Sequence, residues 1–214
     1  MTHFPLFLDL KDKEILIFGG GEFALQRVKK LLPFSVRLRV ISEQISEEIR
    51  QMENYETVIL EERTFSENDL ERFPPFVIIA EDEEKTAEIY EACKQRHIPV
   101  NAVDQPKYCD IIFPSVVSTE HLCIGISSGG ISPTATVEFK ERIERMIPEN
   151  MDDILEWMGD LRIYINANLL KEKRKRALRK AFQKAVEMNR PLTSEELQNE
   201  IFEKVNDCLD SLFS

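Results

Sequence analysis

Short apolar runs alternate with segments of helical periodicity over the first half of the chain. The runs are only a few residues long and rich in branched side chains, which is typical of buried strands. The expected strands are 15–18, 36–41, 57–60, 76–80 and 100–103. Strands that alternate with helices favour a parallel sheet with right-handed crossovers. The first half is therefore predicted to be an α/β domain with a Rossmann-like parallel sheet.

Helices are expected between these runs. After the second strand, 42–52 reads as a polar helix that begins at Ser42 or Ser46, because serine is a favourable N-cap residue. A short helical turn is expected at 69–73, and a longer helix at 84–97. The longer helix is expected to bury Ala87, Ile89, Tyr90 and Cys93.

The pattern changes from Asp110 onward. Two apolar segments, 111–117 and 122–127, are separated by four polar residues and predict a hairpin-like pair of strands. A second glycine-containing turn follows, with Ser132 as N-cap and Pro133 at the first position of a helix. We expect that helix to end near Met146.

The last third of the chain, 151–214, predicts three helices. Gly159 is its only glycine, and the third helix begins at a capping box formed by Thr193 and Glu196. Between these features, 171–180 carries seven basic residues and one acidic residue. The favoured interpretation of this run is a solvated helix face. The alternative is that the run attracts an anionic substrate.

Three consecutive glycines, Gly19, Gly20 and Gly21, follow the first strand and open a helix. Read as G-x-G-x-x-A, Gly19 permits a sharp turn, Gly21 lets a pyrophosphate approach the backbone, and Ala24 keeps the helix close to the sheet. The unpaired N–H groups of the helix N-terminus, at Glu22 and beyond, favour a phosphate. A plain strand-to-helix turn is the alternative, and the strand–helix alternation that follows favours dinucleotide binding.

Acidic residues follow several strands of the predicted sheet. Parallel sheets bind ligands beyond the carboxyl ends of their strands, and Glu43, Asp82 and Asp104 all fall on that edge with the glycine turn. Glu43 is a candidate acceptor for the adenosine ribose hydroxyls, or a solvent-facing residue in the first turn of a helix. No arginine lies just beyond it to pair with a 2′-phosphate, which favours NAD over NADP. Asp104 is a candidate proton acceptor, or a loop carboxylate that caps a turn.

Composition excludes several other classes of protein. The chain has 214 residues, is 43% hydrophobic and 31% charged, and carries a formal net charge of −11, so neither disorder nor general binding to nucleic acid or an anionic membrane is expected. No apolar run is long enough to span a membrane, and a cytoplasmic location is expected. Free thiols and no metal site are expected, because the cysteines and histidines are scattered. They are Cys93, Cys109, Cys123, Cys208, His3, His97 and His121.

Five motifs together resemble the precorrin-2 dehydrogenase family, which includes the N-terminal module of siroheme synthases. The motifs are FPLF at 4–7, GGGEFA at 19–24, NAVD at 101–104, IFPS at 112–115 and SSGGISP at 127–133. They occur in the order and spacing of that family and cover residues 3 to about 148. Two departures are Glu81, where the family often has threonine, and Ser35, where it usually has glycine before the second strand.

The resemblance implies an enzyme that oxidises precorrin-2 to sirohydrochlorin with NAD. It implies an NAD-binding domain over 1–113, a dimerisation segment over 114–148 and a C-terminal helical domain over 149–214, in a homodimer. Asp104 would be the catalytic carboxylate, and Ser128 would line the substrate cleft. Cofactor contacts would fall on Glu22, Phe23, Glu43 and Gln44.

Two functional alternatives remain open at the level of sequence. Some members of the family also insert Fe²⁺ into sirohydrochlorin, and the residues do not decide whether this chain does. A protein of the same fold could also bind NAD or a tetrapyrrole without turnover.

Overall fold

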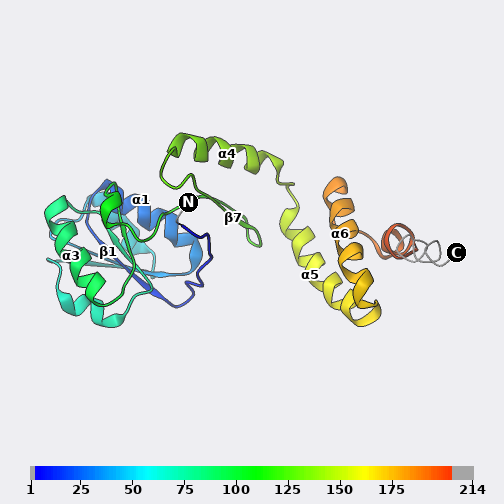
Figure 1. Ribbon diagram of the computed structural model, residues 1–214, viewed down its shortest axis with the longest axis horizontal. Helices are drawn as coiled ribbons and strands as arrows, with labels where there is room; N and C mark the ends of the chain where they lie inside the picture. Colours follow the sequence, from blue (N-terminus) through cyan, green and yellow to red (C-terminus); the bar gives the residue numbers. More distant parts are fainter. Residues whose placement is uncertain (1–2, 204–214) are drawn as a thin grey trace. The chain divides into compact units, whose positions relative to one another are not determined.

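The computed structural model describes residues 3–203. The chain folds into two compact units, the first ending at Phe113 and the second beginning at Pro114 (Figure 1). The site that the glycine turn belongs to lies in the first unit.

The first unit contains a five-stranded parallel sheet, as the alternating pattern predicts. The strand order is β3-β2-β1-β4-β5, so the chain leaves β1 in one direction and crosses to the other side at β4. The strands are β1 (Glu14–Phe18), β2 (Arg37–Ser42), β3 (Val58–Glu62), β4 (Val77–Ile79) and β5 (Val100–Ala102). This is the Rossmann-like α/β class, and the prediction of fold class is confirmed.

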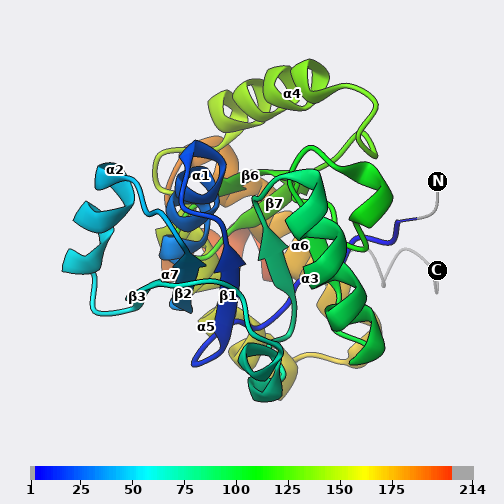
Figure 2. The same ribbon diagram turned by 90° about the vertical axis from the view of Figure 1, so that its left-hand side faces the viewer.

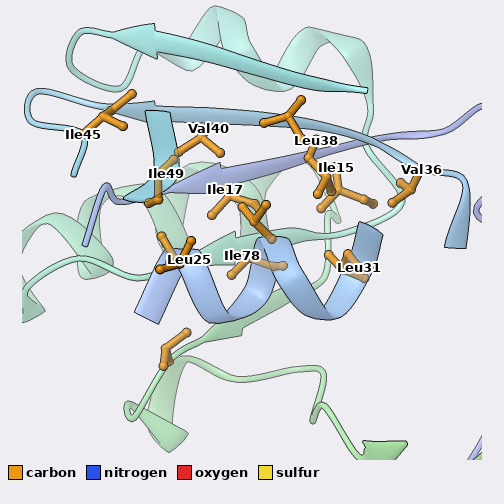
Figure 3. Close-up of a cluster of buried hydrophobic side chains, with 14 of the residues drawn as sticks. Ile15, Ile17, Leu25, Leu31, Val36, Leu38, Val40, Ile45, Ile49 and Ile78 are labelled. Atoms are coloured by element: carbon orange, nitrogen blue, oxygen red, sulfur yellow. The ribbon is translucent and has the colours of Figure 1, made fainter. Parts of the chain in front are cut away.

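Helices cover both faces of this sheet, because successive side chains along each strand point to opposite faces. Ile15 and Ile17 of β1 pack with α1 (Glu22–Leu31), and Figure 3 shows side chains of β1, β2 and β4 gathered against that helix. Leu16 and Phe18 pack on the other face with α3 (Glu83–Gln95). Figure 2 shows α1 and α3 on the two sides of the sheet. The central strand is therefore buried from Ile15 to Phe18, including its carboxyl end.

The edge strand β5 is covered by the segment that returns after it. Backbone N–H groups of Asp110 and Ile111 donate to the carbonyl of Val100 at 2.8 and 3.0 Å. The buried amide of Asn101 donates to the carbonyl of Ile111 at 2.8 Å. Asn101, the first residue of the NAVD motif, thus anchors the strand whose end carries Asp104.

Several sequence predictions for the helices need correction. The expected helix over 42–52 is only α2 (Glu47–Arg50), which follows the N-cap Ser46 and continues into the short 3-10 helix Gln51–Asn54. Ser42 belongs to β2, because its backbone continues the ladder beside Glu62. The turn expected at 69–73 is a 3-10 helix over Glu67–Arg72, which begins at a capping box.

The prediction for the helix at 84–97 is also partly wrong. Observed as α3, the helix buries Ile89 and Cys93 as expected, but Thr86 and Ala92 are buried in place of Ala87 and Tyr90, which are half-buried. The hydroxyl of Thr86 donates to the carbonyl of Glu81 at 3.2 Å. That hydrogen bond allows a polar residue to take the buried position.

The second unit begins with an antiparallel pair of strands, β6 (Ser115–Ser118) and β7 (Cys123–Ile126). The pair confirms the hairpin prediction, but the first strand starts at Ser115 and not at 111. Ile111 and Phe113 instead pack on the core of the first unit, beside α1. The helix α4 (Pro133–Met146) follows, with the hydroxyl of Ser132 accepting from the N–H of Ala135 as predicted.

The remaining helices form a separate cluster. Its buried residues include Ala177, Ala181 and Ala185, whose small side chains bring two helices close together. The helices are α5 (Met151–Asn168), α6 (Lys171–Met188), α7 (Ser194–Glu196) and a π-helical segment over Leu197–Glu203. The Thr193–Glu196 capping box forms as predicted. The basic residues of α6 are divided between two environments, with Lys171, Lys175, Arg176 and Arg179 exposed and Lys173, Arg174 and Lys180 half-buried.

Asp152, in the first turn of α5, binds the turn between β6 and β7. Its carboxylate accepts from the hydroxyl of Thr119 at 2.6 Å and from the backbone N–H groups of His121 and Glu120 at 2.9 and 3.2 Å. These hydrogen bonds, that of Thr119 above all, hold the pKa of Asp152 below its usual value.

We expect Asp152→Asn to destabilise the second unit at pH 7. A carboxyl group whose pKa is lower in the folded state stabilises the fold above its unfolded pKa, and this is lost as the pH falls through the folded pKa. Urea unfolding followed by the fluorescence of Trp157, the single tryptophan, should show a lower midpoint for the variant at pH 7. The difference in midpoint between wild type and variant should become smaller below about pH 4. Asp153→Asn, a neighbouring exposed carboxylate, is the control and should leave the midpoint unchanged. A difference in midpoint that stays constant with pH would contradict this role for the Asp152 charge.

Candidate cofactor and catalytic site

Backbone register aligns the predicted site residues along one edge of the sheet. Phe18 pairs with both Ile41 and Ile79, and Ile79 pairs with Ala102, so four strands end in one row. The residues two positions beyond this row are Gly20, Glu43, Glu81 and Asp104. The order of strands reverses between β1 and β4, and open α/β sheets bind ligands at such a point.

The glycine turn is packed against two backbone carbonyls. A Cβ atom at Gly19 would lie 2.4 Å from the carbonyl oxygen of Ala80, and its φ of +123° disfavours other residues. At Gly20 a Cβ would lie 1.9 Å from the carbonyl oxygen of Gln44. The carbonyl of Gly20 also accepts from the N–H of Ser46 at 2.8 Å. Gly19 and Gly20 therefore join the end of β1 to β4 and to the loop after β2.

Gly21 is different, because a Cβ atom there would meet no atom within 4 Å. Gly21 is the N-cap residue of α1, and no side chain caps that helix. Glu22 and Phe23 of the first turn are exposed, whereas Ala24 is fully buried against the sheet. The open space and the uncapped N–H groups fit a pyrophosphate, as the G-x-G-x-x-A interpretation requires.

Glu43 directly follows β2, at the same edge. The helix begins only at Glu47, so the alternative that Glu43 lies in a first helical turn is wrong. Its carboxylate is 2.5 Å from the ammonium group of Lys85, and that contact raises the pKa of Lys85. Gln44 has an exposed side chain, and its backbone carbonyl supports Gly20.

Glu81, at the end of β4, was not among the predicted site residues. Its carboxylate accepts from the hydroxyl of Ser42 at 3.3 Å, a hydrogen bond between the ends of β2 and β4. Burial raises the pKa of Glu81, while Lys85, whose ammonium group is 4.0 Å away, opposes that change. Its position just after a strand, like those of Glu43 and Asp104, was the signal available in the sequence.

Asp82 caps a helix. It is the N-cap residue of α3, and its carboxylate accepts from the N–H of Lys85 at 3.0 Å. Asp82 therefore has a structural role at the predicted edge, and its contact with a cofactor stays a prediction.

Asp104 follows β5 in a left-handed conformation, with φ of +56°. Its side chain is exposed and accepts no hydrogen bond from residues 3–203, so no contact supports the alternative that it caps a turn. The next residue, Gln105, donates to the carbonyl of Glu81 at 3.0 Å and to the hydroxyl of Thr86 at 3.1 Å. These bonds fix the turn that presents the Asp104 carboxylate.

Ser128 belongs to the second unit. Its half-buried hydroxyl accepts from the N–H of Ser132 at 2.9 Å, in a turn where Gly129 and Gly130 both have positive φ. The turn is ordered by this contact, and a role in substrate binding stays a prediction.

Within residues 3–203, no group of three or more His, Cys, Asp or Glu side chains could hold a metal ion. No described helix is both long and apolar enough to cross a membrane. Cys93, Cys109 and Cys123 are free thiols, and Cys208 lies outside the described residues.

A Rossmann-like sheet whose first helix begins at an open, uncapped glycine turn is typical of dinucleotide-binding proteins. A family model described as "Putative NAD(P)-binding" matches residues 6–115, which is more than half of the chain. The chain belongs to this NAD(P)-binding family, and the family description supports the predicted NAD cofactor.

The chain is also similar to siroheme synthases. It is 31% identical over 169 residues to that of Psychrobacter sp. (strain PRwf-1), covering 79% of this chain and 35% of the relative. It is 35% identical over 150 residues to that of Pseudomonas paraeruginosa (strain DSM 24068 / PA7), covering 70% of this chain and 32% of the relative. The chain thus spans about a third of the length of these relatives, and the family resemblance indicated by the motifs is confirmed.

A solved structure shares the fold. The protein described as "SirC, precorrin-2 dehydrogenase" aligns with a TM-score of 0.65 over 96% of this chain and 100% of its own, at 21% identity. The match confirms the arrangement of parallel sheet, strand pair and C-terminal helices.

The glycine turn gives a direct test by substitution. We expect Gly20→Ala to destabilise the protein by about 2–4 kcal/mol, because a backbone carbonyl occupies the place of the new methyl group. Gly21→Ala should change stability by less than about 1 kcal/mol, since its φ of −98° and the open space accept a methyl group. Denaturant unfolding of both variants measures the difference, and equal stabilities would contradict the packing described here.

Proposed function

We propose that this chain catalyses the NAD-dependent oxidation of precorrin-2 to sirohydrochlorin, a step of siroheme biosynthesis. The observation that carries the proposal is the Asp104 carboxylate, which is exposed, uncapped and on the same edge as the glycine turn. The similarity to siroheme synthases and to a precorrin-2 dehydrogenase supports the choice of substrate.

The reaction removes a hydride and a proton from one substrate molecule. Bound NAD⁺ would supply the hydride acceptor, and the enzyme must supply a group that takes the proton. Asp104 is proposed for this role because its oxygens have no competing hydrogen-bond donor among the described residues. The contacts of Gln105 fix the backbone turn from which the Asp104 side chain extends at the edge of the sheet.

Several residues of this edge would contact the bound cofactor. The N–H groups from Gly21 onward would bind the pyrophosphate, and Glu43 would accept the ribose hydroxyls. The exposed side chains of Glu22, Phe23 and Gln44 and the N-cap carboxylate of Asp82 border these positions. NAD is proposed over NADP because a carboxylate at Glu43 would repel a 2′-phosphate, although its partner Lys85 weakens that repulsion.

Asp104→Asn tests the catalytic assignment. We expect turnover to fall by on the order of 10²-fold or more, with NAD affinity and melting temperature near wild type, because the amide keeps the size but cannot act as a base. NADH appearance after addition of precorrin-2 measures turnover, calorimetric titration measures NAD binding, and thermal unfolding measures stability.

A matched control is Asp110→Asn. The carboxylate of Asp110 accepts from the N–H of Val100 at 3.1 Å and has a structural role, so this change should alter stability and spare turnover per folded molecule. Near wild-type turnover in a folded, NAD-binding Asp104→Asn protein would end the assignment. A wild-type chain that binds NAD and never oxidises precorrin-2 would support the non-catalytic alternative.

The second unit supports a further proposal, that the chain forms a homodimer. The helix α4 buries none of its own side chains, and Val137 and Phe139 are 49% and 56% exposed. Ile131, just before the helix, is 89% exposed. Apolar residues gathered on one helix and its approach favour an interface between copies of the chain.

We expect Val137→Glu combined with Phe139→Glu to convert the dimer into a monomer, because charges on a buried interface are unfavourable. Ile163→Glu, at an exposed apolar position of α5, is the control and should leave the dimer intact. Sedimentation analysis at micromolar concentration distinguishes the species, and a monomeric wild type would contradict the proposal.

A further inference from the structure

Arg27 differs from the other arginines of the first unit. It forms no ion pair and donates no hydrogen bond within residues 3–203, and its Nε atom is buried without an acceptor. Each of the others donates to a carboxylate or a carbonyl oxygen: Arg37, Arg39, Arg50, Arg63, Arg72 and Arg96. Buried donors without partners are rare and call for an explanation.

The position of the Arg27 side chain is fixed by an aromatic ring. Its guanidinium carbon lies 5.1 Å from the ring centroid of Phe113, within the range of a cation–π contact. The ring of Phe113 is held in turn by an edge contact with the buried Phe76, at 5.9 Å between centroids. Arg27 therefore does not depend on a ligand for its placement.

Arg27 lies within electrostatic reach of Asp104. Burial lowers the pKa of the Arg27 guanidinium, and the charges of Asp104 and Cys109 oppose that change. Arg27 and Asp104 form no ion pair with each other, so no direct contact between them neutralises the guanidinium. A cation that is half-buried and unpaired favours an anion from outside the protein.

We propose that Arg27 is a substrate-binding residue that pairs with a carboxylate group of the substrate beside Asp104. This inference rests on the proposed function, since the tetrapyrrole substrate carries many carboxylates. Such a substrate approaching the Asp104 carboxylate, in a chain with a net charge of −11, is repelled unless a nearby cation compensates. The planar fork of arginine suits a carboxylate in particular.

The dinucleotide phosphates are the other possible anion, and the geometry favours the carboxylate. Arg27 lies about one and a half helical turns, roughly 7 Å along the axis, beyond Glu22 at the start of α1. The N-terminus of the helix already accounts for the pyrophosphate. The anion at Arg27 should therefore belong to the ligand that also reaches Asp104.

The test compares two ligands on the same variants. Uroporphyrin III, a stable fluorescent tetrapyrrole with eight carboxylates, is the probe for the substrate, and NAD is titrated separately by calorimetry. We expect Arg27→Gln to raise the Kd of uroporphyrin III by about 10-fold or more and to leave the Kd of NAD within about twofold. The KM for precorrin-2 should rise with it.

Two further variants separate binding from folding. Arg27→Lys keeps a charge over Phe113 and should recover part of the affinity, while Lys29→Gln removes one charge from the exposed face of the same helix and should leave both Kd values unchanged. An unchanged Kd for uroporphyrin III in folded Arg27→Gln would overturn the inference, and so would a selective loss of NAD affinity. A wild type that oxidises precorrin-2 alongside such a result would leave the proposed function intact, whereas a wild type without turnover would count against the proposed function itself.

Discussion

The close approach of the glycine turn to two backbone carbonyls is the constraint on which the first unit depends. Ala80 directly follows β4, and Gln44 lies in the loop after β2. Their carbonyl oxygens occupy the space that Cβ atoms would need at Gly19 and Gly20. Three chain segments from different parts of the sequence therefore meet at the end of β1. Gly19 and Gly20 make these close contacts, whereas the space next to Gly21 is open.

This constraint also explains which parts of the site could be predicted from sequence. The strand–helix alternation, the N-cap at Ser132 and the capping box at Thr193 are local signals, and each was confirmed. The requirement for glycine at position 20 was missed because it arises from Gln44, which approaches only in the folded sheet. Periodicity alone likewise left two possible starts for the helix after β2, and the structure selects Ser46 because Ser42 has its hydrogen bonds in the sheet.

Residues whose roles depend on contacts between elements were the hardest to predict. Glu81 was passed over because one sequence does not show that Ser42 and Lys85 meet it from two other elements. The strand expected from 111 begins only at Ser115 for a similar reason, because Ile111 and Phe113 pack in the core of the first unit beside α1. Phe113 in turn positions Arg27, a residue that helical periodicity places on a solvated face.

The four acidic residues that follow strands on the ligand edge have different environments. These differences indicate which carboxylate is suited to accept a proton. Asp82 is occupied as a helix cap, Glu43 is paired with Lys85, and burial raises the pKa of Glu81, whose carboxylate also accepts from Ser42. Asp104 is exposed, and no donor among residues 3–203 engages its oxygens. Hydrogen bonds and ion pairs stabilise the charged form of a carboxylate and so make it a weaker proton acceptor than a carboxylate without them. The edge as a whole is acidic and would repel an anionic ligand. Under the proposed function, the unpaired cation of Arg27 would compensate this repulsion for a polycarboxylate substrate.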